Sequence, residues 1–441
     1  MGNEGTHAYL SAFARLEDSL NGRSATSLHA LRRSAIGRFE KLGFPGSRDE
    51  AWFHTNVAQL ARTPFRPTTP EDARRSWRSE PAFQELTASR LVFVNGFYSA
   101  EDSRAESLPQ GVRACSLAEL KASEADRMEG NIARHAAFDE HAFVALNTAF
   151  LQDGAFIYVP RGTAVETPIH VVFVSTASGA PSISHPRTLV LAEENSQVTI
   201  VESYTGDGAY FTNAVTEVIA DDSAKVDHYK LELESPEAFH IATMQSRQGA
   251  RSDLSTHAIS IGGKLVRNEV NALLAGEAGE ATVNGFYLTD REQHIDNHTL
   301  IEHAEPNCNS HELYKGILGG RSSGVFRGKI HVHRKAQETD AYQSNQSLLI
   351  SEGADINTKP QLEIYADQVK CSHGATIGQL DENAVFYLRS RGLSHATAQR
   401  ILVHAFAVDI LNRIKPESVR NYLERIVMDK FELARAGGSA P

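Results

Sequence analysis

Three regions of the chain differ in the period of their hydrophobic positions. The first region carries mostly helical spacing, clearest in residues 24–42, where apolar side chains recur three and four positions apart and Gly43 follows as a stop signal. A short apolar run over residues 91–94 ends at Asn95-Gly96 and predicts one strand. We therefore expect an N-terminal, mostly helical region over residues 1–150.

The middle of the chain, residues 151–378, changes to a period of two. Segments of roughly five to nine residues alternate apolar and polar side chains, as in residues 187–191, 196–201 and 225–233. No helical segment separates them, which excludes a doubly wound α/β fold and leaves a large sandwich, a barrel or a solenoid. Small and polar residues at many strand positions favour the solenoid, because tight coils stack equivalent positions closely. The predicted fold class is mainly β.

Helical spacing returns after Gly378. Asp381, Ser394 and Pro416 each suit the start of a helix, and apolar residues at helical spacing follow each of them. Three amphipathic helices at this end would either pack on the β-domain or dock a partner. We expect a C-terminal helical region over residues 379–436, followed by a flexible tail over residues 437–441.

Composition and charge narrow the class of protein. The chain has 441 residues and a formal net charge of −11, which argues against a binder of nucleic acid or of anionic membranes. Its three cysteines cannot form a disulfide framework, so a reducing compartment is expected. The N-terminus lacks an apolar signal segment, and no stretch approaches the length of a membrane span. These features predict a cytoplasmic protein.

Several motifs of enzyme chemistry are missing from the sequence. The nearest approach to a phosphate-binding Walker A loop is residues 258–265, where Ala replaces the first Gly and Leu replaces Ser or Thr. There is also no GxGxxG for a dinucleotide and no GxSxG for an acyl enzyme. We therefore expect no ATP hydrolysis by this chain alone.

Three groups of potential metal ligands remain. One is a His-rich stretch that is best interpreted as partly exposed polar residues stacked on successive strands: His294, His298, His303 and His311, with Glu302, Glu305 and Glu312. His331 and His333 share one strand face, and Glu338 follows, which resembles half of a cupin metal site for Zn, Fe or Mn; the same residues also suit a solvated polar ladder. Cys371 and His373 likewise project to one side of a strand, beside Lys370, whose charge favours the thiolate. One Cys and one His make only half of a tetrahedral site, so further ligands would come from elsewhere or from a partner.

The sequence around Cys371 closely resembles the C-terminal signature of the SufB/SufD family of iron–sulfur cluster assembly scaffolds. The matching run covers residues 358–382 and continues over residues 386–392. Residues 333–353 and the GFPGSRDEAW element at residues 43–52 look like the same family. The D-type branch fits better, because B-type subunits carry a GHEAT-type sequence where this chain has Cys-Ser-His-Gly-Ala-Thr.

The resemblance implies a right-handed parallel β-helix between two helical regions. It also implies a SufB-like subunit paired through the β-helix, and a SufC-like ABC ATPase docked on the C-terminal helices. Cys371 and His373 would then lie near the interface with the SufB-like subunit, where a transient iron–sulfur cluster is built. The chain itself would be non-catalytic and would hold no tightly bound cofactor. Whether the isolated chain forms a homodimer stays open.

Two rival functions follow from the residues. One is a stand-alone, cupin-like metalloprotein using His331, His333 and Glu338. The weaker one is a carbohydrate-active β-helix enzyme, against which the missing signal segment and the missing carboxylate cluster on adjacent strands both count.

Overall fold

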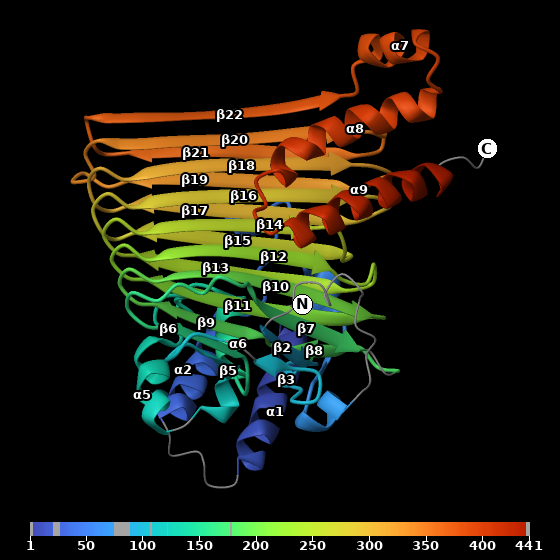
Figure 1. Ribbon diagram of the computed structural model, residues 1–441. Helices are drawn as coiled ribbons and strands as arrows, with labels where there is room; N and C mark the ends of the chain where they lie inside the picture. Colours follow the sequence, from blue (N-terminus) through green and yellow to red (C-terminus); the bar gives the residue numbers. More distant parts are fainter. Residues whose placement is uncertain are drawn as a thin grey trace.

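The computed structural model describes residues 3–20, 27–74, 89–105, 108–120, 122–176 and 179–437. Its centre is a parallel β-solenoid of about eight turns, whose successive strands alternate between two sheets (Figure 1). The first sheet contains β6 (Ala155–Val159), β8 (Ser182–Ser184), β9 (Arg187–Ala192), β11 (Tyr210–Ala220), β13 (Phe239–Gln248), β15 (Leu265–Leu274), β17 (His294–His303), β19 (Ser323–Val332) and β21 (Asp355–Ile364). The second contains β7 (Ile169–Thr176), β10 (Gln197–Asp207), β12 (Lys225–Leu233), β14 (Asp253–Ser260), β16 (Glu280–Thr289), β18 (Asn309–Leu318), β20 (Thr339–Leu349) and β22 (Val369–Gln379).

Equivalent residues of consecutive coils lie side by side in parallel register. Phe239 pairs with Leu265, and Ala155 pairs with Thr188, so one coil takes 26 to 33 residues. Side chains alternate between the outer faces and the interior, where a single apolar cluster extends from the first coils to the last. The predicted mainly β solenoid, with its period of two, is therefore confirmed.

Six successive coils, from β10 to β20, enter the second sheet through one residue other than Gly that has a left-handed backbone. These residues have φ between 56° and 61°, and they are Asn195, Ser223, Arg251, Ala278, Asn307 and Glu338. Residues other than Gly rarely adopt this backbone conformation. Here each of these N–H groups donates to a carbonyl in the turn of the next coil, at 2.6 to 3.1 Å, and the stacked turns hold the conformation in place.

The N-terminal helices lie against the outer face of the first sheet. They are α1 (Asn3–Ser19), α2 (Ser27–Leu42), α3 (Ala58–Arg62), α5 (Ala122–Asn131) and α6 (Ala142–Ala149), with 3-10 turns at Glu50–Trp52, Pro70–Arg74 and Leu117–Glu119. The helix predicted over residues 24–42 is α2, although residues 24–26 fall outside the described residues. Gly43 ends it with a φ of 63°.

Short strands close the N-terminal end of the solenoid. They are β1 (Arg66–Pro67), β2 (Ser89–Val94), β3 (Phe97–Tyr98), β4 (Arg104–Ala105) and β5 (Arg113–Ser116). The predicted strand at residues 91–94 is β2, which pairs in parallel with β7. Antiparallel strands β3 and β4 pair with β2, and β5 pairs with β6 in the same way.

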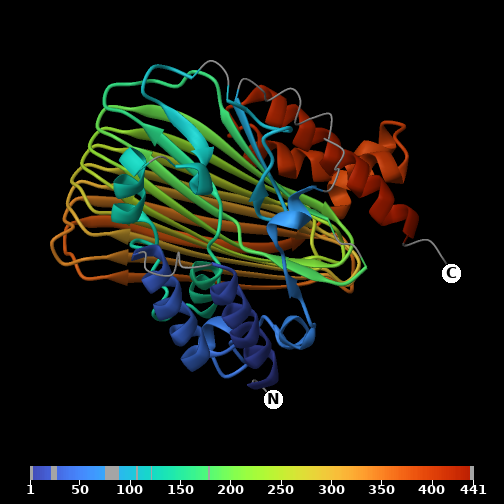
Figure 2. The ribbon, with the colours of Figure 1, turned by 90° about the horizontal axis from the view of Figure 1, so that it is seen from below.

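The C-terminal helices are α7 (Glu382–Ser390), α8 (His395–Leu411) and α9 (Glu417–Gly437). Asp381 and Ser394 cap the first two by accepting backbone N–H groups, as their residue types predict. α8 and α9 pack on the outer face of the second sheet through an apolar cluster, on a different side of the solenoid from the N-terminal helices (Figure 2). No helix in the described part of the chain combines the length and apolarity needed to cross a bilayer.

Candidate functional site at the open end of the solenoid

The last coil has no strand on its outer side among the described residues. β22 pairs with β20 along one edge only, and β21 pairs only with β19 (Figure 1). Most residues of β22 are therefore exposed, whereas the residues beside them on β20 are mostly buried. An unpaired strand edge of this length offers its backbone N–H and C=O groups to another chain.

Cys371 and His373 lie together on this last strand, on the side that continues the solenoid interior. Cys371 is in register with Ala341 and His373 with Gln343, and both of these β20 residues are fully buried. Cys371 is half-buried against the interior apolar cluster, and His373 is exposed. The structure thus brings the two predicted donors to one side of one strand, at the mouth of the solenoid.

The surroundings of Cys371 favour its neutral thiol over the thiolate. Burial raises its pKa above the ordinary value, and the neighbouring Asp340 carboxylate raises it further. This upward shift of the pKa runs against the expectation that Lys370 favours the thiolate. A bound metal ion would have to displace the thiol proton.

A buried carboxyl group lies directly behind His373. Gln343 is the β20 neighbour of His373, and its Nε2 donates to Oε2 of Glu312 on β18 at 2.6 Å. Burial raises the pKa of Glu312 to about 7, although the hydrogen bond from Gln343 acts in the opposite direction. The donor pair at the mouth is therefore backed by a group that titrates near neutral pH.

The other predicted ligands are only partly brought together. His331 and His333 lie side by side, with ring centroids 4.8 Å apart. The carboxylate beside them is Glu302 of β17, whose Oε1 lies 2.5 Å from His333 Nε2. Glu338 instead occupies the left-handed turn position, and its N–H donates to Gln368. The parallel solenoid also differs from the antiparallel double sheet of a cupin, so the alternative prediction of a cupin-like fold is wrong.

The sequence analysis placed Glu302 with the His-rich stretch around it, not with His331 and His333, because about 30 residues separate it from them along the chain. The signal that could have found it is the coil length. Glu302 and His331 are register partners exactly one coil apart on β17 and β19. Glu312 and Gln343 are likewise register partners one coil apart, on β18 and β20.

A cluster of charged groups deeper in the solenoid is structural. Lys230 Nζ lies 2.6 Å from Glu232 Oε1, and His240 bridges Glu232 and Glu234 at 2.9 and 3.0 Å. Burial raises the pKa of Glu232, but Lys230 and His240 outweigh it and hold that pKa well below the usual range. The groups satisfy one another and are all buried, so they offer nothing to a ligand from outside.

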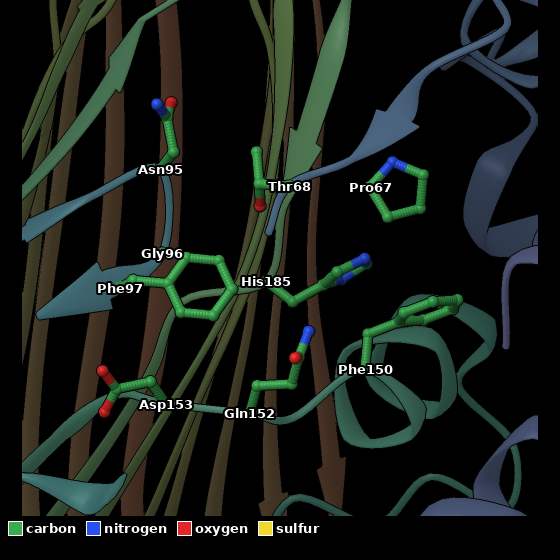
Figure 3. A pocket seen from close by; sticks show the side chains of 9 residues that line it. All are labelled: Pro67, Thr68, Asn95, Gly96, Phe97, Phe150, Gln152, Asp153 and His185. Carbon is green, nitrogen blue, oxygen red and sulfur yellow. The ribbon is translucent and has the colours of Figure 1, made fainter. Parts of the chain in front are cut away.

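A small hollow at the N-terminal end of the solenoid also contains polar groups with a structural role (Figure 3). It is lined by Pro67, Thr68, Asn95, Gly96, Phe97, Phe150, Gln152, Asp153 and His185. Asp153 accepts hydrogen bonds from Ser116 and from the backbone of Tyr98 and Gly154. Burial lowers the pKa of His185 to about 3, and its ring stacks on Phe150. These contacts join the first coil to α6 and do not form a ligand site.

Comparison with known proteins identifies relatives along almost the whole chain. Residues 173–406 match the family model of the SufBD core domain of the SUF system for FeS cluster assembly, and residues 3–171 match the SufBD protein N-terminal region.

Three relatives illustrate the range of similarity. An iron–sulfur cluster assembly SufBD family protein of Synechocystis is 34% identical over 418 residues, which is 92% of each chain. The chloroplastic protein ABCI7 of Arabidopsis thaliana is 32% identical over 92% of this chain and 87% of its own length. The iron–sulfur cluster assembly protein SufD of Escherichia coli is 28% identical over 91% of this chain and 90% of its own.

Proposed function

The chain belongs to the SufBD family of iron–sulfur cluster assembly proteins, and we propose that it is a non-catalytic, D-type scaffold subunit that completes a cluster-building site with a SufB-like partner. One observation carries this proposal. Cys371 and His373 form a pair of soft and borderline donors at the mouth of a solenoid whose last strand is unpaired. Two donors on an open edge suit a site that two chains share.

The open edge supplies the means of pairing. β22 is eleven residues long, and a strand of a SufB-like chain can add to it through backbone hydrogen bonds. Large apolar side chains are exposed on the last coils: Tyr342 on β20, Ile364 and Tyr365 at the end of β21, and Ile377 on β22. Burial of these side chains against a partner chain would favour association.

A shared site explains why this chain holds so few ligands. Iron–sulfur clusters commonly take four Cys ligands, and Cys115 and Cys308 lie away from the last coil, on β5 and in the turn before β18. The remaining ligands of the nascent cluster would come from the SufB-like chain. The cluster is cargo here, built at the interface and then passed on.

The C-terminal helices are the docking place for a SufC-like ABC ATPase in this proposal. α8 and α9 are fixed to the second sheet by apolar contacts and by the Lys315–Asp409 ion pair of 2.8 Å. α7 projects beyond the last coil in Figure 1, and Phe386 and Tyr387 on it are 70% and 56% exposed. A rigid base carrying an exposed aromatic pair suits a subunit that transmits motion from the ATPase to the open end.

The proposal is tested on the complex co-expressed with SufB-like and SufC-like chains of the same organism. The variants are His373→Ala and Cys371→Ser, with His311→Ala as a control because His311 is an exposed histidine on β18 of the same sheet. We expect His373→Ala to lower the iron and sulfide assembled per complex, while His311→Ala leaves both unchanged. The effect of Cys371→Ser is expected to be smaller.

The mass of each complex separates loss of the site from loss of assembly. If the His373→Ala complex keeps its full mass and its full iron and sulfide content, the assignment of His373 is refuted. The mass of the isolated chain, measured in the same way, tests whether a second copy covers the open edge when the SufB-like partner is absent.

A further inference from the structure

Four polar side chains gather on the outer face of the first sheet, near the end of β19. Glu302, His331 and Glu363 are register partners on β17, β19 and β21, so they form a row across three consecutive coils. His333 lies two residues beyond His331 and points to the same side. One ligand atom each from Glu302, His331 and His333 lies within 4.8 Å of the others.

Glu363 prepares His331 to be a ligand through its ε nitrogen. Its Oε2 lies 3.2 Å from His331 Nδ1, and Lys329 Nζ lies 2.6 Å from the same oxygen. Gln361 donates to the other oxygen at 2.8 Å. A carboxylate held in this way accepts a hydrogen bond from Nδ1–H and leaves the Nε2 lone pair free, which is the usual arrangement behind a metal-bound histidine.

The remaining two ligand groups already touch. Glu302 Oε1 and His333 Nε2 lie 2.5 Å apart, close enough for one ion to replace the proton between them after a small separation. Side-chain exposures are 33% for Glu302, 26% for His331 and 38% for His333. An ion held here would therefore keep open positions for water and exchange with solvent.

We infer that Glu302, His331 and His333 bind a divalent first-row transition-metal ion, with Glu363 as the positioning residue behind His331. Two imidazoles and one carboxylate favour Zn²⁺ or Fe²⁺ over Mg²⁺ and Ca²⁺, which prefer oxygen ligands. This metal site is separate from Cys371 and His373. The metal site lies on the first sheet, near the ends of β19 and β21, and the Cys371–His373 pair lies near the start of β22 in the second sheet. The inference does not depend on the proposed scaffold function.

The test uses the isolated full chain after removal of metal with a chelator. Zn²⁺ and, without oxygen, Fe²⁺ are titrated against a competing chelator, and Co²⁺ serves as a visible probe of coordination. We expect one site per chain and cobalt bands typical of nitrogen and oxygen ligands without thiolate. His331→Ala and His333→Ala should each weaken binding by more than about 100-fold, and Glu363→Gln by about 10- to 100-fold.

Two matched controls sharpen the experiment. Glu338→Gln removes the carboxylate that is near His333 in sequence but outside the group, whereas Glu302→Gln removes the one within it. His311→Ala removes an exposed strand histidine elsewhere. We expect only Glu302→Gln among these three to weaken binding.

Three outcomes would overturn the inference: no saturable binding of either ion, equal binding by the His331→Ala chain, or cobalt bands that show a thiolate ligand. Because the residues are partly exposed, the variants should fold, and circular dichroism checks this. Where His→Ala does unfold the chain, Glu302→Gln and Glu363→Gln give the same decision. The readout is metal binding by one chain, so its failure differs from loss of cluster assembly by the complex.

Discussion

Replacing Glu312 by Gln should stabilise the protein at alkaline pH and change little at acidic pH. Glu312 is fully buried in the solenoid interior, where its carboxylate accepts a hydrogen bond from the side-chain amide of Gln343. No cation neutralises it in the described interior around β18, and burial raises its pKa from 4.5 to about 7. Glutamine keeps the shape and the acceptor oxygen but never carries the charge.

The size and sign of the effect follow from proton linkage. In the unfolded chain the group loses its proton near pH 4.5, but in the folded chain it does so only near pH 7. Between these values the folded state holds the extra proton, so stability falls as pH rises through this window. Each pH unit corresponds to about 1.4 kcal/mol, so the loss by pH 8 is about 3 kcal/mol. E312Q does not share this loss.

The assay is urea unfolding of both proteins at several pH values from 5 to 8.5. The difference between them at each pH cancels the other titrating groups, and it should grow in favour of E312Q by about 3 kcal/mol. Infrared spectroscopy gives an independent measure, because a protonated carboxyl band should disappear near pH 7 in the wild type only. If the two proteins have parallel pH profiles and no such band is seen, the conclusion that Glu312 is buried with a raised pKa and without a cationic partner is refuted.

Three further predictions concern other parts of the chain. Arg187→Met should lower the free energy of unfolding by about 3–5 kcal/mol, because it leaves the fully buried Glu217 without its ion partner. Thermal or urea unfolding measures this loss, and an unchanged midpoint would contradict the prediction. Gly285→Ala should cost about 1–3 kcal/mol, since its Cβ would come within 2.0 Å of the Tyr314 ring, and a neutral result would show that the ring can move. Phe386→Ser should leave unfolding of the isolated chain within about 0.5 kcal/mol but weaken co-purification with the ATPase, and retained co-purification would exclude this surface.

The fold was predictable wherever one local signal decides the structure. The period of two marked the strands, and residue types at helix starts marked the caps, as Asp381 and Ser394 show. The turns were not predictable, because the left-handed position is filled by Asn, Ser, Arg, Ala or Glu with no common residue. What holds that position is a hydrogen bond to the next coil, which local sequence does not display.

The candidate sites divide along the same line. Cys371 and His373 are two residues apart, so strand alternation alone places them on one side. Glu302 and His331 are a whole coil apart, and coils vary between 26 and 33 residues, so the strand register decides whether the two side chains meet. Glu338 is close to His333 along the chain, so it looked like a suitable ligand. It lies in a turn, however, where its backbone N–H donates to the next coil, and it does not share a strand face with the two histidines.

The two ends of the solenoid differ in a way that bears on function. A solenoid needs terminal caps, since an exposed last repeat leaves its interior and its strand edges open. At the N-terminal end, antiparallel β3, β4 and β5 finish the sheets. At the other end, α8 and α9 pack on an outer face of the second sheet, so in the described chain they leave the mouth uncovered. The polar column that runs from Glu312 through Gln343 to His373 therefore ends at the surface, where a cap from a second chain would both bury it and place that chain's ligands beside His373.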